Sequence, residues 1–394
     1  MLALLTRNRT SPIAVDFGAC SLRAVQMIRR ADGWHVYHWF NVETDPVSAE
    51  PPPIDYAAHL KMALGPGAFA GRRAAITLAP PDLEYRLIDL PTALLTRKAS
   101  ELHEALQFEL DRQLPWPAKD TEMAAWPVGA GNGPCTSTMV AAAPTTAIQT
   151  SLDILEARDL ECVLADVTPN AIIRLLEQSS DRSAAANRRN LPGKDEDNVL
   201  WGALDIGFRA CRLYLVHNNR PVYARVLRGG GRELTESLAR GLHVEFGVAE
   251  QYKRLYGIQP TDRGLRSMVG GLGRVSEEAL PGMLYAILAR TLENLAVEIE
   301  KSYRFVLDRT PSAITGGLYL LGGGARLKGL AEVLSQKLGI TVRVPDPAAM
   351  IRNAQQGTPS GQGGPTGGWH PACTPIQFPV LAVGMGLAMR EDIA

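Results

Sequence analysis

Two short segments of the sequence each place an aspartate at the end of a buried strand and a glycine two residues later. Asp16 and Gly18 occur in IAVDFG, and Asp205 and Gly207 occur in LWGALDIG. A turn at such a glycine points backbone N–H groups into one small volume, and the missing side chain lets a phosphate approach them. Mg²⁺ prefers oxygen ligands and usually keeps several waters. The pattern predicts a nucleotide held between the two segments, with Asp16 and Asp205 contacting its Mg²⁺ through water.

A third glycine-rich segment, GGG at 322–324, lies at a predicted junction between a strand and a helix. Its backbone offers a surface for a base or sugar, and the N-terminus of the following helix would lie near negative charge. A single aspartate and glycine at this spacing is ordinary turn chemistry. Two such turns at the ends of matching strands, followed by a third glycine loop, favour phosphate binding.

The elements around the two aspartates repeat along the chain. Aligning AVDFGACSLRAV (14–25) with ALDIGFRACRLY (203–214) places Asp16 over Asp205 at a constant offset of 189. Each segment is typical of a strand, a tight turn and a second strand, and each continues through a polar turn into a third strand. Two occurrences indicate a duplicated domain rather than a solenoid.

Helices and further strands are expected between and after these hairpins. Leucines spaced four apart indicate an amphipathic helix that ends before Pro115, and another helix is expected to begin at Thr168-Pro169 with Thr168 as its N-cap. A long helix is expected from about 283 to 307, because apolar residues mark one of its faces. Gly339 stands where the C-terminal cap of a later helix belongs. The alternation of strands and helices predicts an α/β fold with two similar halves.

Composition excludes several classes of protein. The 394 residues include 41 Lys plus Arg and 41 Asp plus Glu, so the formal net charge is zero. Proteins that bind nucleic acid or an anionic membrane surface usually carry an excess of basic residues. The five cysteines never form a CxxC pair, which argues against a disulfide framework and a zinc site. No apolar run approaches the roughly 18 residues of a spanning helix, so direct membrane insertion is not expected.

The order of these motifs resembles that of the actin, Hsp70 and sugar-kinase superfamily. Within it the sequence is most similar to the PilM family of type IV pilus assembly proteins, which are relatives of the division protein FtsA. The resemblance covers almost the whole chain and includes LEYRLIDLP, RVLRGGGRELTESLARGL, AEQYKR, LYLLGGGARLKGLAEVLSQKLGI and FPVLAVGMGLAMRE. It implies an α/β fold of duplicated actin-like (ribonuclease H-like) domains, with a nucleotide cleft between them and a small inserted α/β subdomain.

The resemblance divides the chain into two domains, and we also expect an inserted subdomain, a second subdomain within domain 2, a linker and a loop. They are expected at 12–81 and 146–178 (domain 1), 82–145 (the inserted subdomain), 179–198 (a flexible linker), 199–394 (domain 2), roughly 232–310 (a second subdomain within domain 2) and 352–372 (a disordered loop). The linker and the loop are rich in small or polar residues and lack a hydrophobic period.

The family's roles, carried over to matching positions, give an expected set of ATP-binding residues. The set is Asp16, Gly18, Cys20, Ser21 and Arg23 as phosphate-1; Asp205 and Gly207 as phosphate-2; Gly229, Gly230 and Gly231 before a nucleotide-facing helix; Glu250 and Lys253 near ribose and base; and Gly322, Gly323, Gly324 and Arg326 as the adenosine loop. Without the family context, Glu250 and Lys253 would be interpreted as an exposed pair on a helix.

The sequence departs from the family pattern after the second aspartate and glycine. The family usually has small hydroxyl residues there, whereas this chain has Phe208, Arg209 and Ala210. Phe208 would crowd a phosphate, and Arg209 would compensate if it reached the anion. Hydrolysis also needs a group that orients water, and the one candidate is Asp166, for which a capping or loop role is the alternative. We therefore expect ATP binding with slow hydrolysis at most.

The resemblance implies a cytoplasmic scaffold in the inner-membrane complex of a type IV pilus machine. Such a protein would be recruited to the membrane by the short cytoplasmic tail of a single-span PilN-like partner, bound beside the subdomain at 82–145. ATP would close the two halves and change the affinity for the partner or for a second copy, and other inner-membrane pilus components are further candidate partners. Two alternatives remain open: a scaffold with a degenerate site that does not respond to nucleotide, and a small-molecule kinase of the same superfamily.

Overall fold

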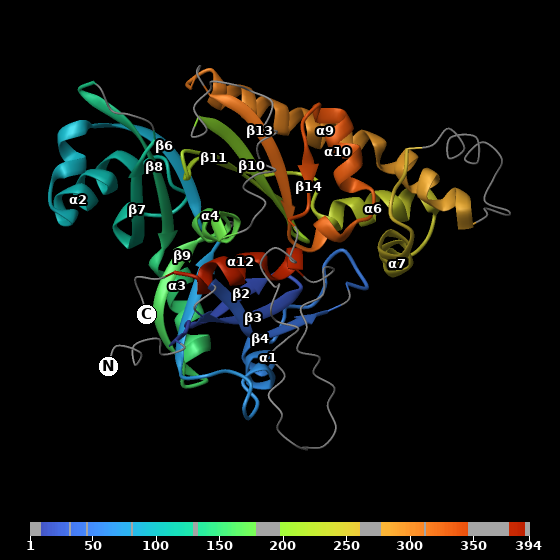
Figure 1. The fold of residues 1–394 in the computed structure, drawn as a ribbon, viewed down its shortest axis with the longest axis horizontal. Helices are drawn as coiled ribbons and strands as arrows, with labels where there is room; N and C mark the ends of the chain where they lie inside the picture. The colour runs from blue at the N-terminus through green and yellow to red at the C-terminus, as the bar shows by residue number, and fades with distance from the viewer. Residues whose placement is uncertain are drawn as a thin grey trace.

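The computed structural model describes residues 9–30, 33–44, 46–79, 82–128, 133–178, 198–260, 277–310, 313–345 and 378–390. The expected disordered loop at 352–372 and all but the last residue of the expected linker at 179–198 lie outside these ranges. We call residues 9–178 the first half and residues 198–390 the second half. Figure 1 shows the main sheets of the two halves with helices α4 (Thr168–Gln178) and α12 (Phe378–Ala388) lying between them.

The main sheet of the first half is built around the hairpin that carries Asp16. Its strands in the described residues are β1 (Arg9–Thr10), β2 (Ile13–Gly18), β3 (Ser21–Arg30), β4 (Gly33–Glu43), β5 (Arg73–Leu78) and β9 (Glu161–Val167). β3 pairs antiparallel with β1, β2 and β4, whereas β5 pairs parallel with β2 and β9. Successive side chains of a strand face opposite sides. Ile13 and Val15 therefore pack with α1 (Tyr56–Ala63) and α3 (Thr145–Glu156), while Ala14 packs with α4 and α12.

The main sheet of the second half repeats this arrangement. Its described strands are β10 (Val199–Ile206), β11 (Cys211–His217), β12 (Arg220–Leu227), β13 (Ile314–Leu321) and β14 (Val342–Arg343). β10, β11 and β12 pair antiparallel, and β13 pairs parallel with β10 and β14. Each half thus places a three-stranded antiparallel unit beside two parallel strands, which confirms the predicted duplication.

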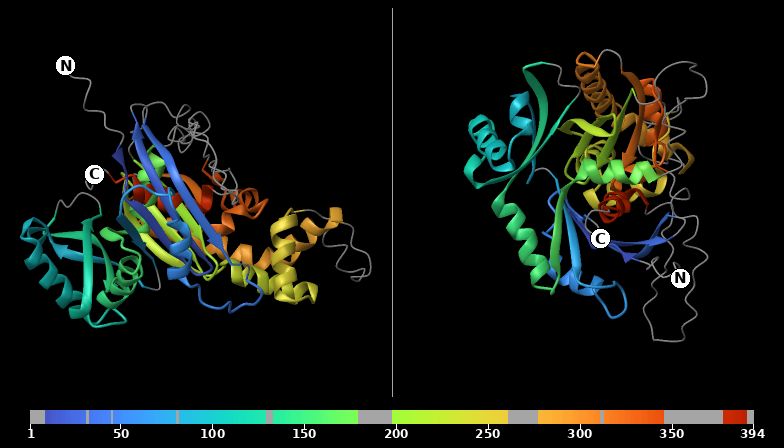
Figure 2. Two further views of the ribbon diagram at one scale, coloured as in Figure 1. Left: turned by 90° about the horizontal axis from the view of Figure 1, so that it is seen from below. Right: turned by 60° about the vertical axis from the view of Figure 1, so that its left-hand side comes forward.

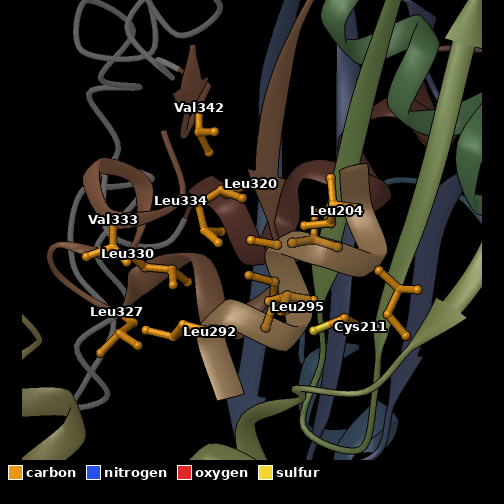
Figure 3. Packing of buried hydrophobic residues seen from close by; sticks show 14 of the residues in the cluster. Leu204, Cys211, Leu292, Leu295, Leu320, Leu327, Leu330, Val333, Leu334 and Val342 are labelled. Carbon is orange, nitrogen blue, oxygen red and sulfur yellow. The ribbon is translucent and has the colours of Figure 1, made fainter. Parts of the chain in front are cut away.

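Four helices pack with the second sheet: α6 (Gly231–Leu242), α7 (Phe246–Tyr256), α9 (Leu280–Leu307) and α10 (Leu330–Leu338). The long helix α9 begins three residues before the predicted start and ends at the predicted residue. Figure 3 shows Leu292 and Leu295 of α9 in one cluster of buried side chains with Leu204 of β10 and Leu334 of α10. Gly339 follows α10 with φ 65° and donates its N–H to Ser335, so the predicted C-terminal cap is confirmed.

A third sheet lies between β5 and β9 in the sequence. Its strands β6 (Glu84–Pro91), β7 (Thr121–Pro127) and β8 (Cys135–Pro144) are antiparallel, and the chain between β6 and β7 forms α2 (Ala99–Leu110) and the 3-10 helices η1 (Thr92–Thr96) and η2 (Ala118–Asp120). Leu106 and Leu110 of α2 pack on this sheet. Figure 2 shows this unit at one end of the molecule, with α7 and α9 toward the other end. The Trp126 indole N–H donates to the Pro221 carbonyl oxygen at 2.7 Å, which ties the unit to the second half. The domain boundaries themselves stay a prediction.

Helices α4 and α12 form the shared core of the two halves. Residues of α12 are buried against strands of both main sheets, including Val25 of β3 and Tyr319 of β13. A Cβ at Gly386 would lie 1.8 Å from the Ala171 carbonyl oxygen, so only glycine allows the two helices to approach this closely. α4 begins at Thr168 as predicted, but the Thr168 hydroxyl donates to the Leu78 carbonyl oxygen and so joins the helix to β5 instead of capping it. Within the described residues, no helix is both long and apolar enough to span a membrane.

Candidate functional site

The first hairpin holds Asp16 next to Arg23. The turn between β2 and β3 is tight, so Asp16 lies opposite Arg23 and Gly18 lies opposite Ser21. Arg23 Nη1 donates to Asp16 Oδ2 at 2.8 Å, and both side chains are largely buried. A Cβ at Gly18 would lie 2.4 Å from the Oγ of Ser21, which is itself buried. The predicted phosphate-1 residues therefore form a compact turn with one internal ion pair.

The second hairpin repeats this ion pair. Asp205 of β10 lies opposite Arg212 of β11, and Arg212 Nη1 lies 3.3 Å from Asp205 Oδ2. Gly207 donates its N–H to the Ala210 carbonyl oxygen at 3.0 Å. Arg212 was missing from the predicted site. The signal for it was present, because the offset of 189 that relates the two aspartates also relates Arg23 to Arg212.

The two ion pairs lie close enough to influence each other. Burial raises the pKa of Asp205, and the neighbouring Arg212 opposes this rise. From the other half, the charge of Asp16 adds to the rise and that of Arg23 reduces it. The predicted phosphate-1 and phosphate-2 segments are thus brought together at the junction of the two halves.

The glycine loop at 322–324 packs directly on the second hairpin. A Cβ at Gly322 would lie 2.3 Å from Asp205 Oδ1, and a Cβ at Gly324 would lie 2.1 Å from Ile206 Cγ2. Gly322 also has φ 77°, a left-handed conformation that favours glycine. Gly323 differs, because a Cβ there would meet nothing closer than 3.9 Å. Gly322 and Gly324 allow the close approach, whereas a side chain at Gly323 would only contact Arg326.

The helix after this loop begins later than the sequence indicated. The 3-10 helix η6 (Gly323–Arg326) follows the glycines, and α10 begins only at Leu330. Between them, Gly329 adopts φ 83°, where a Cβ would lie 1.9 Å from the Ile258 carbonyl oxygen. The predicted junction of a strand and a helix is present, but the helix that begins at the glycines is a short 3-10 helix, and the α-helix starts only after this extra turn against Ile258.

Arg326 of the predicted adenosine loop is bound to the first half. Its Nη2 donates to Glu43 Oε2 at 2.7 Å, at the end of β4. Burial alone would raise the pKa of Glu43, but the guanidinium of Arg326 outweighs it and the pKa is lowered. A second ion pair joins Arg232 of α6 to Glu50. Neither contact was predicted.

The glycine turn at 229–231 packs the N-terminus of α6 against the second hairpin. The N–H groups of Gly231 and of the next residue donate to the carbonyl oxygens of Gly207 and Phe208, at 2.9 and 2.8 Å. A Cβ at Gly230 would lie within 3 Å of three backbone atoms of the hairpin turn, and Gly229 has φ 103°. The first N–H groups of a helix are natural anion donors. Here two of them are used by the protein's own hairpin.

Phe208 and Arg209 form the tip of the second hairpin. The ring of Phe208 packs edge-on against Phe246 at the start of α7, with 6.4 Å between ring centroids. Arg209 is exposed. Burial raises the pKa of the Cys20 thiol and of the Tyr56 hydroxyl, and the charge of Arg209 opposes both rises. Arg209 therefore acts on the first hairpin from across the junction.

Glu250 and Lys253 form a buried network between α6 and α7. Lys253 Nζ donates to Glu250 Oε2 at 2.5 Å, to Thr235 Oγ1 at 2.6 Å and to the Gly231 carbonyl oxygen at 3.1 Å. Arg254 Nε donates to Glu250 Oε1 at 2.8 Å. The interpretation from spacing alone, an exposed pair, is wrong because both side chains are only about a tenth exposed. A role near ribose and base stays a prediction.

Asp166 is committed to structural contacts. It accepts hydrogen bonds from Arg174 Nη2 at 2.6 Å, from the Val167 N–H at 2.7 Å and from Asn170 Nδ2 at 3.2 Å. Arg390 Nη1 also lies 3.7 Å from its Oδ2. The geometry supports the loop role that was the alternative to orienting water.

The carboxylates of Asp16 and Asp205 do not form a preformed site for direct coordination of Mg²⁺. Each carboxylate accepts a hydrogen bond from an arginine of its own hairpin. In the part of the chain that the structure describes, no group of three or more His, Cys, Asp or Glu residues could hold a metal ion. The donor set does not fit a directly bound ion, and contact through water stays a prediction.

The duplicated sheets, with glycine loops meeting where the halves join, define an actin-like ATPase fold. A family model of the type IV pilus assembly protein PilM matches residues 15–262, more than half of the chain. The chain therefore belongs to the PilM family. A model of the cell division protein FtsA also matches residues 203–361.

Individual proteins agree with this assignment. A solved structure described as a PilM–PilN type IV pilus biogenesis complex has a TM-score of 0.69 and 23% identity, and the match covers 96% of this chain and 98% of that chain. At this identity the likeness shows the fold. FtsA of Staphylococcus epidermidis is 25% identical over 148 residues, and FtsA of Streptococcus pneumoniae serotype 2 is 26% identical over 158 residues. These matches cover 37% and 38% of this chain, which spans about a third of the length of these curated relatives.

Proposed function

We propose that this protein is an ATP-binding scaffold of the inner-membrane assembly complex of a type IV pilus. One observation carries the nucleotide part: the two equivalent Asp–Arg hairpins lie close enough for the charges of Asp16 and Arg23 to act on Asp205, and the loop at 322–324 packs on Asp205. Backbone N–H groups at glycine turns and nearby cations are the groups that bind phosphates. Membership of the PilM family supports the assignment to the pilus machine.

The ligand proposed for this junction is ATP. The test is a titration of the purified chain with ATP, compared with Gly323→Trp. A Cβ at Gly323 would meet only Arg326 Nη2, at an ordinary contact distance of 3.9 Å, so the variant should fold while its indole covers the expected adenosine surface. We expect saturable 1:1 binding by the wild type and at least about tenfold weaker binding by the variant. Absence of binding by the wild type would contradict the proposal and favour the nucleotide-independent scaffold.

Hydrolysis is proposed to be weak or absent. The supporting observation is the engagement of Asp166, whose carboxylate is held by Arg174, Val167 and Asn170. A carboxylate that orients an attacking water needs a free oxygen within hydrogen-bond reach of that water. In this proposal ATP acts as a conformational ligand, and turnover measured by phosphate release should stay near background.

The switch is proposed to act on the contacts between the halves. Glu43 and Arg326 join β4 to the loop after β13, and Glu50 and Arg232 join the first half to α6. A nucleotide that contacts both hairpins adds interactions in the closed arrangement that an open one lacks. A ligand shifts an equilibrium only through such a difference in affinity.

The proposed partner is the cytoplasmic tail of a PilN-like protein with a single membrane span. The fold matches, over nearly the whole of both chains, a structure described as a PilM–PilN complex. The tail is proposed to bind beside the small sheet of β6, β7 and β8, which Trp126 also connects to the second half. The protein would then sit at the cytoplasmic face of the inner membrane through this partner. Contacts with other pilus components and with a second copy belong to the same proposal.

The partner is tested with a synthetic peptide that carries the N-terminal tail of the PilN-like protein from the same organism. Fluorescence anisotropy should show saturable binding at micromolar concentrations, with a change in affinity of about threefold or more when ATP is present. A scrambled peptide of the same composition is the control. Equal binding of both peptides would contradict the partner, and an unchanged affinity with ATP would contradict the switch alone.

A further inference from the structure

Each of the two hairpins carries its own cation at the proposed phosphate site. Arg23 and Arg212 occupy equivalent positions opposite the two aspartates. Both guanidinium groups also lie next to the turn glycine of their hairpin, because a Cβ at Gly18 would lie 3.5 Å from Arg23 Nη1 and one at Gly207 would lie 3.2 Å from Arg212 Nη1. The cations thus stand at the glycines where a phosphate would approach.

The two carboxylates are balanced by these arginines. Asp16 and Asp205 each accept a hydrogen bond from the arginine across the strand pair, at 2.8 and 3.3 Å. A divalent cation placed on either carboxylate would stand within a few ångströms of a guanidinium, so like-charge repulsion opposes it. The described residues supply no third acidic, His or Cys ligand that would complete a metal site there.

The Arg23 guanidinium has a donor that no described residue uses. Arginine carries five N–H donors in a planar fork that matches phosphate oxygens. Arg23 uses Nη1 for Asp16, and its Nε is buried without a hydrogen-bond partner in the described residues. A buried donor left without a partner is costly. Because Arg23 Nε is shielded from solvent, a phosphate oxygen would satisfy it only after a local shift of the turn.

Arg209 supplies a third cation from the tip of the second hairpin. It is exposed and makes no hydrogen bond or ion pair with any residue that the structure describes. It nevertheless acts on Cys20 and Tyr56 across the junction, where its charge opposes the rise in their pKa that burial causes. Arg209 thus adds a positive charge beside the two Asp–Arg pairs, where Glu43, Glu250 and Arg254 also act on Cys20.

We propose that the site binds its nucleotide through Arg23, Arg209 and Arg212, and that it needs no divalent metal ion to do so. The ligand class is a metal-free nucleoside polyphosphate whose phosphate oxygens accept hydrogen bonds from the three guanidinium groups. The residues at 208–210, which depart from the usual small hydroxyl loop, then contribute Arg209 as the phosphate-binding group. This inference rests on the proposed nucleotide-binding function.

The test is a calorimetric titration of the full chain with ATP, once in excess EDTA and once with Mg²⁺ in excess over ATP. We expect dissociation constants within about threefold of each other, because fixed cations neutralise the phosphates in both conditions. Arg209→Ala should weaken binding about tenfold in both, whereas the matched exposed control Arg112→Ala in the small third-sheet unit should not. Arg209 is exposed, so its replacement leaves folding intact.

Asp16→Asn separates the two roles of the carboxylate. If Asp16 only balances Arg23, removing its charge should tighten the binding of metal-free ATP by about threefold or more. If it holds Mg²⁺, the same variant should weaken binding, and wild-type binding should need Mg²⁺ by more than about tenfold. That second pattern would overturn this inference and leave the proposed function standing. No binding of ATP by the wild type in either condition would overturn both.

Discussion

The two hairpins share a skeleton and differ at their tips. In each, an aspartate, a glycine two residues later and an arginine on the next strand take equivalent positions, and the aspartate binds the arginine. The first turn is small, with Ser21 lying against Gly18. The second turn carries Phe208 and Arg209, and α6 closes onto it through two backbone hydrogen bonds. The duplicated strands position the Asp–Arg ion pair in both hairpins, and the turn residues determine which groups each hairpin presents to a ligand.

This difference shows why the second hairpin needs more support. Gly230 packs closely on the backbone of the turn, and behind it Lys253 connects the Gly231 carbonyl oxygen to Glu250 of α7. The first turn has a smaller support: Tyr56 donates its hydroxyl to the Gly18 carbonyl oxygen, and Glu43, opposite Ser21, binds the single cation Arg326. Glu250 and Lys253, which the resemblance places near ribose and base, therefore also stabilise the second hairpin. Substitutions in the two regions should have unequal effects.

Breaking the buried network of Glu250 and Lys253 should have the largest effect on the free energy of unfolding. Lys253→Met leaves the carboxylate of Glu250 buried without its main partner, and we expect a loss of about 3–5 kcal/mol in the free energy of unfolding. Urea denaturation measures this loss. The matched control is Lys301→Met, which removes an exposed lysine of α9 and should cost less than about 0.5 kcal/mol. A loss below about 1 kcal/mol for Lys253→Met would remove the proposed asymmetry between the hairpins.

Breaking the two ion pairs tests the shared skeleton. Arg23→Ala and Arg212→Ala each leave a largely buried aspartate without its cation, and we expect each to cost about 2–3 kcal/mol. Unfolding free energies of the two variants, measured under the same conditions, provide the comparison. Costs that agree within about 1 kcal/mol would support equivalent roles. A negligible cost for one variant would mean that the two hairpins share their geometry, but that the ion pair of that hairpin does not stabilise the fold.

Adding a methyl group at Gly230 and at Gly18 tests the difference in packing between the two hairpin turns. Gly230→Ala puts a Cβ within 3 Å of three backbone atoms of the second turn, so the turn must shift and we expect a loss of about 1–3 kcal/mol. At Gly18 the closest atom is the side-chain Oγ of Ser21, which can rotate, so Gly18→Ala should cost less, about 1 kcal/mol or below. Thermal unfolding of both variants decides the order. The reverse order would contradict the tighter packing assigned to the second turn.

The contact between Glu43 and Arg326 should give the smallest effect, together with a characteristic pH dependence. Because the pKa of Glu43 is lowered in the folded protein, this pair stabilises the fold above the ordinary carboxyl pKa of 4.5 and loses that contribution as the pH falls through the lowered value. We expect Glu43→Gln to cost about 1 kcal/mol near pH 7, and this cost should shrink steadily as the pH falls below 4.5. Unfolding free energies of both proteins at pH 7 and along a descending pH series test this. A cost that does not shrink along this series would show that packing, not charge, carries the contact.

Much of the skeleton could be predicted from the sequence. The strands around Asp16 and Asp205 have the apolar runs of buried strands, and the offset of 189 revealed the duplication and held the position of Arg212. Contacts between distant segments were not accessible in this way. Glu43 and Arg326 are 283 positions apart, and no local period links them. The burial of Lys253 also escaped prediction, since the spacing along α7 does not reveal that α6 covers this face.

The most direct test of a nucleotide held between the hairpins is hydrogen–deuterium exchange on the full chain with and without ATP. We predict slower exchange of the backbone amides at 18–21, 207–210 and 322–326 together when ATP is bound, because all three segments surround the phosphates and the adenosine. Exchange in α2 of the small third-sheet unit serves as the internal reference and should not change. Unchanged exchange in all three segments at saturating ATP would contradict the account.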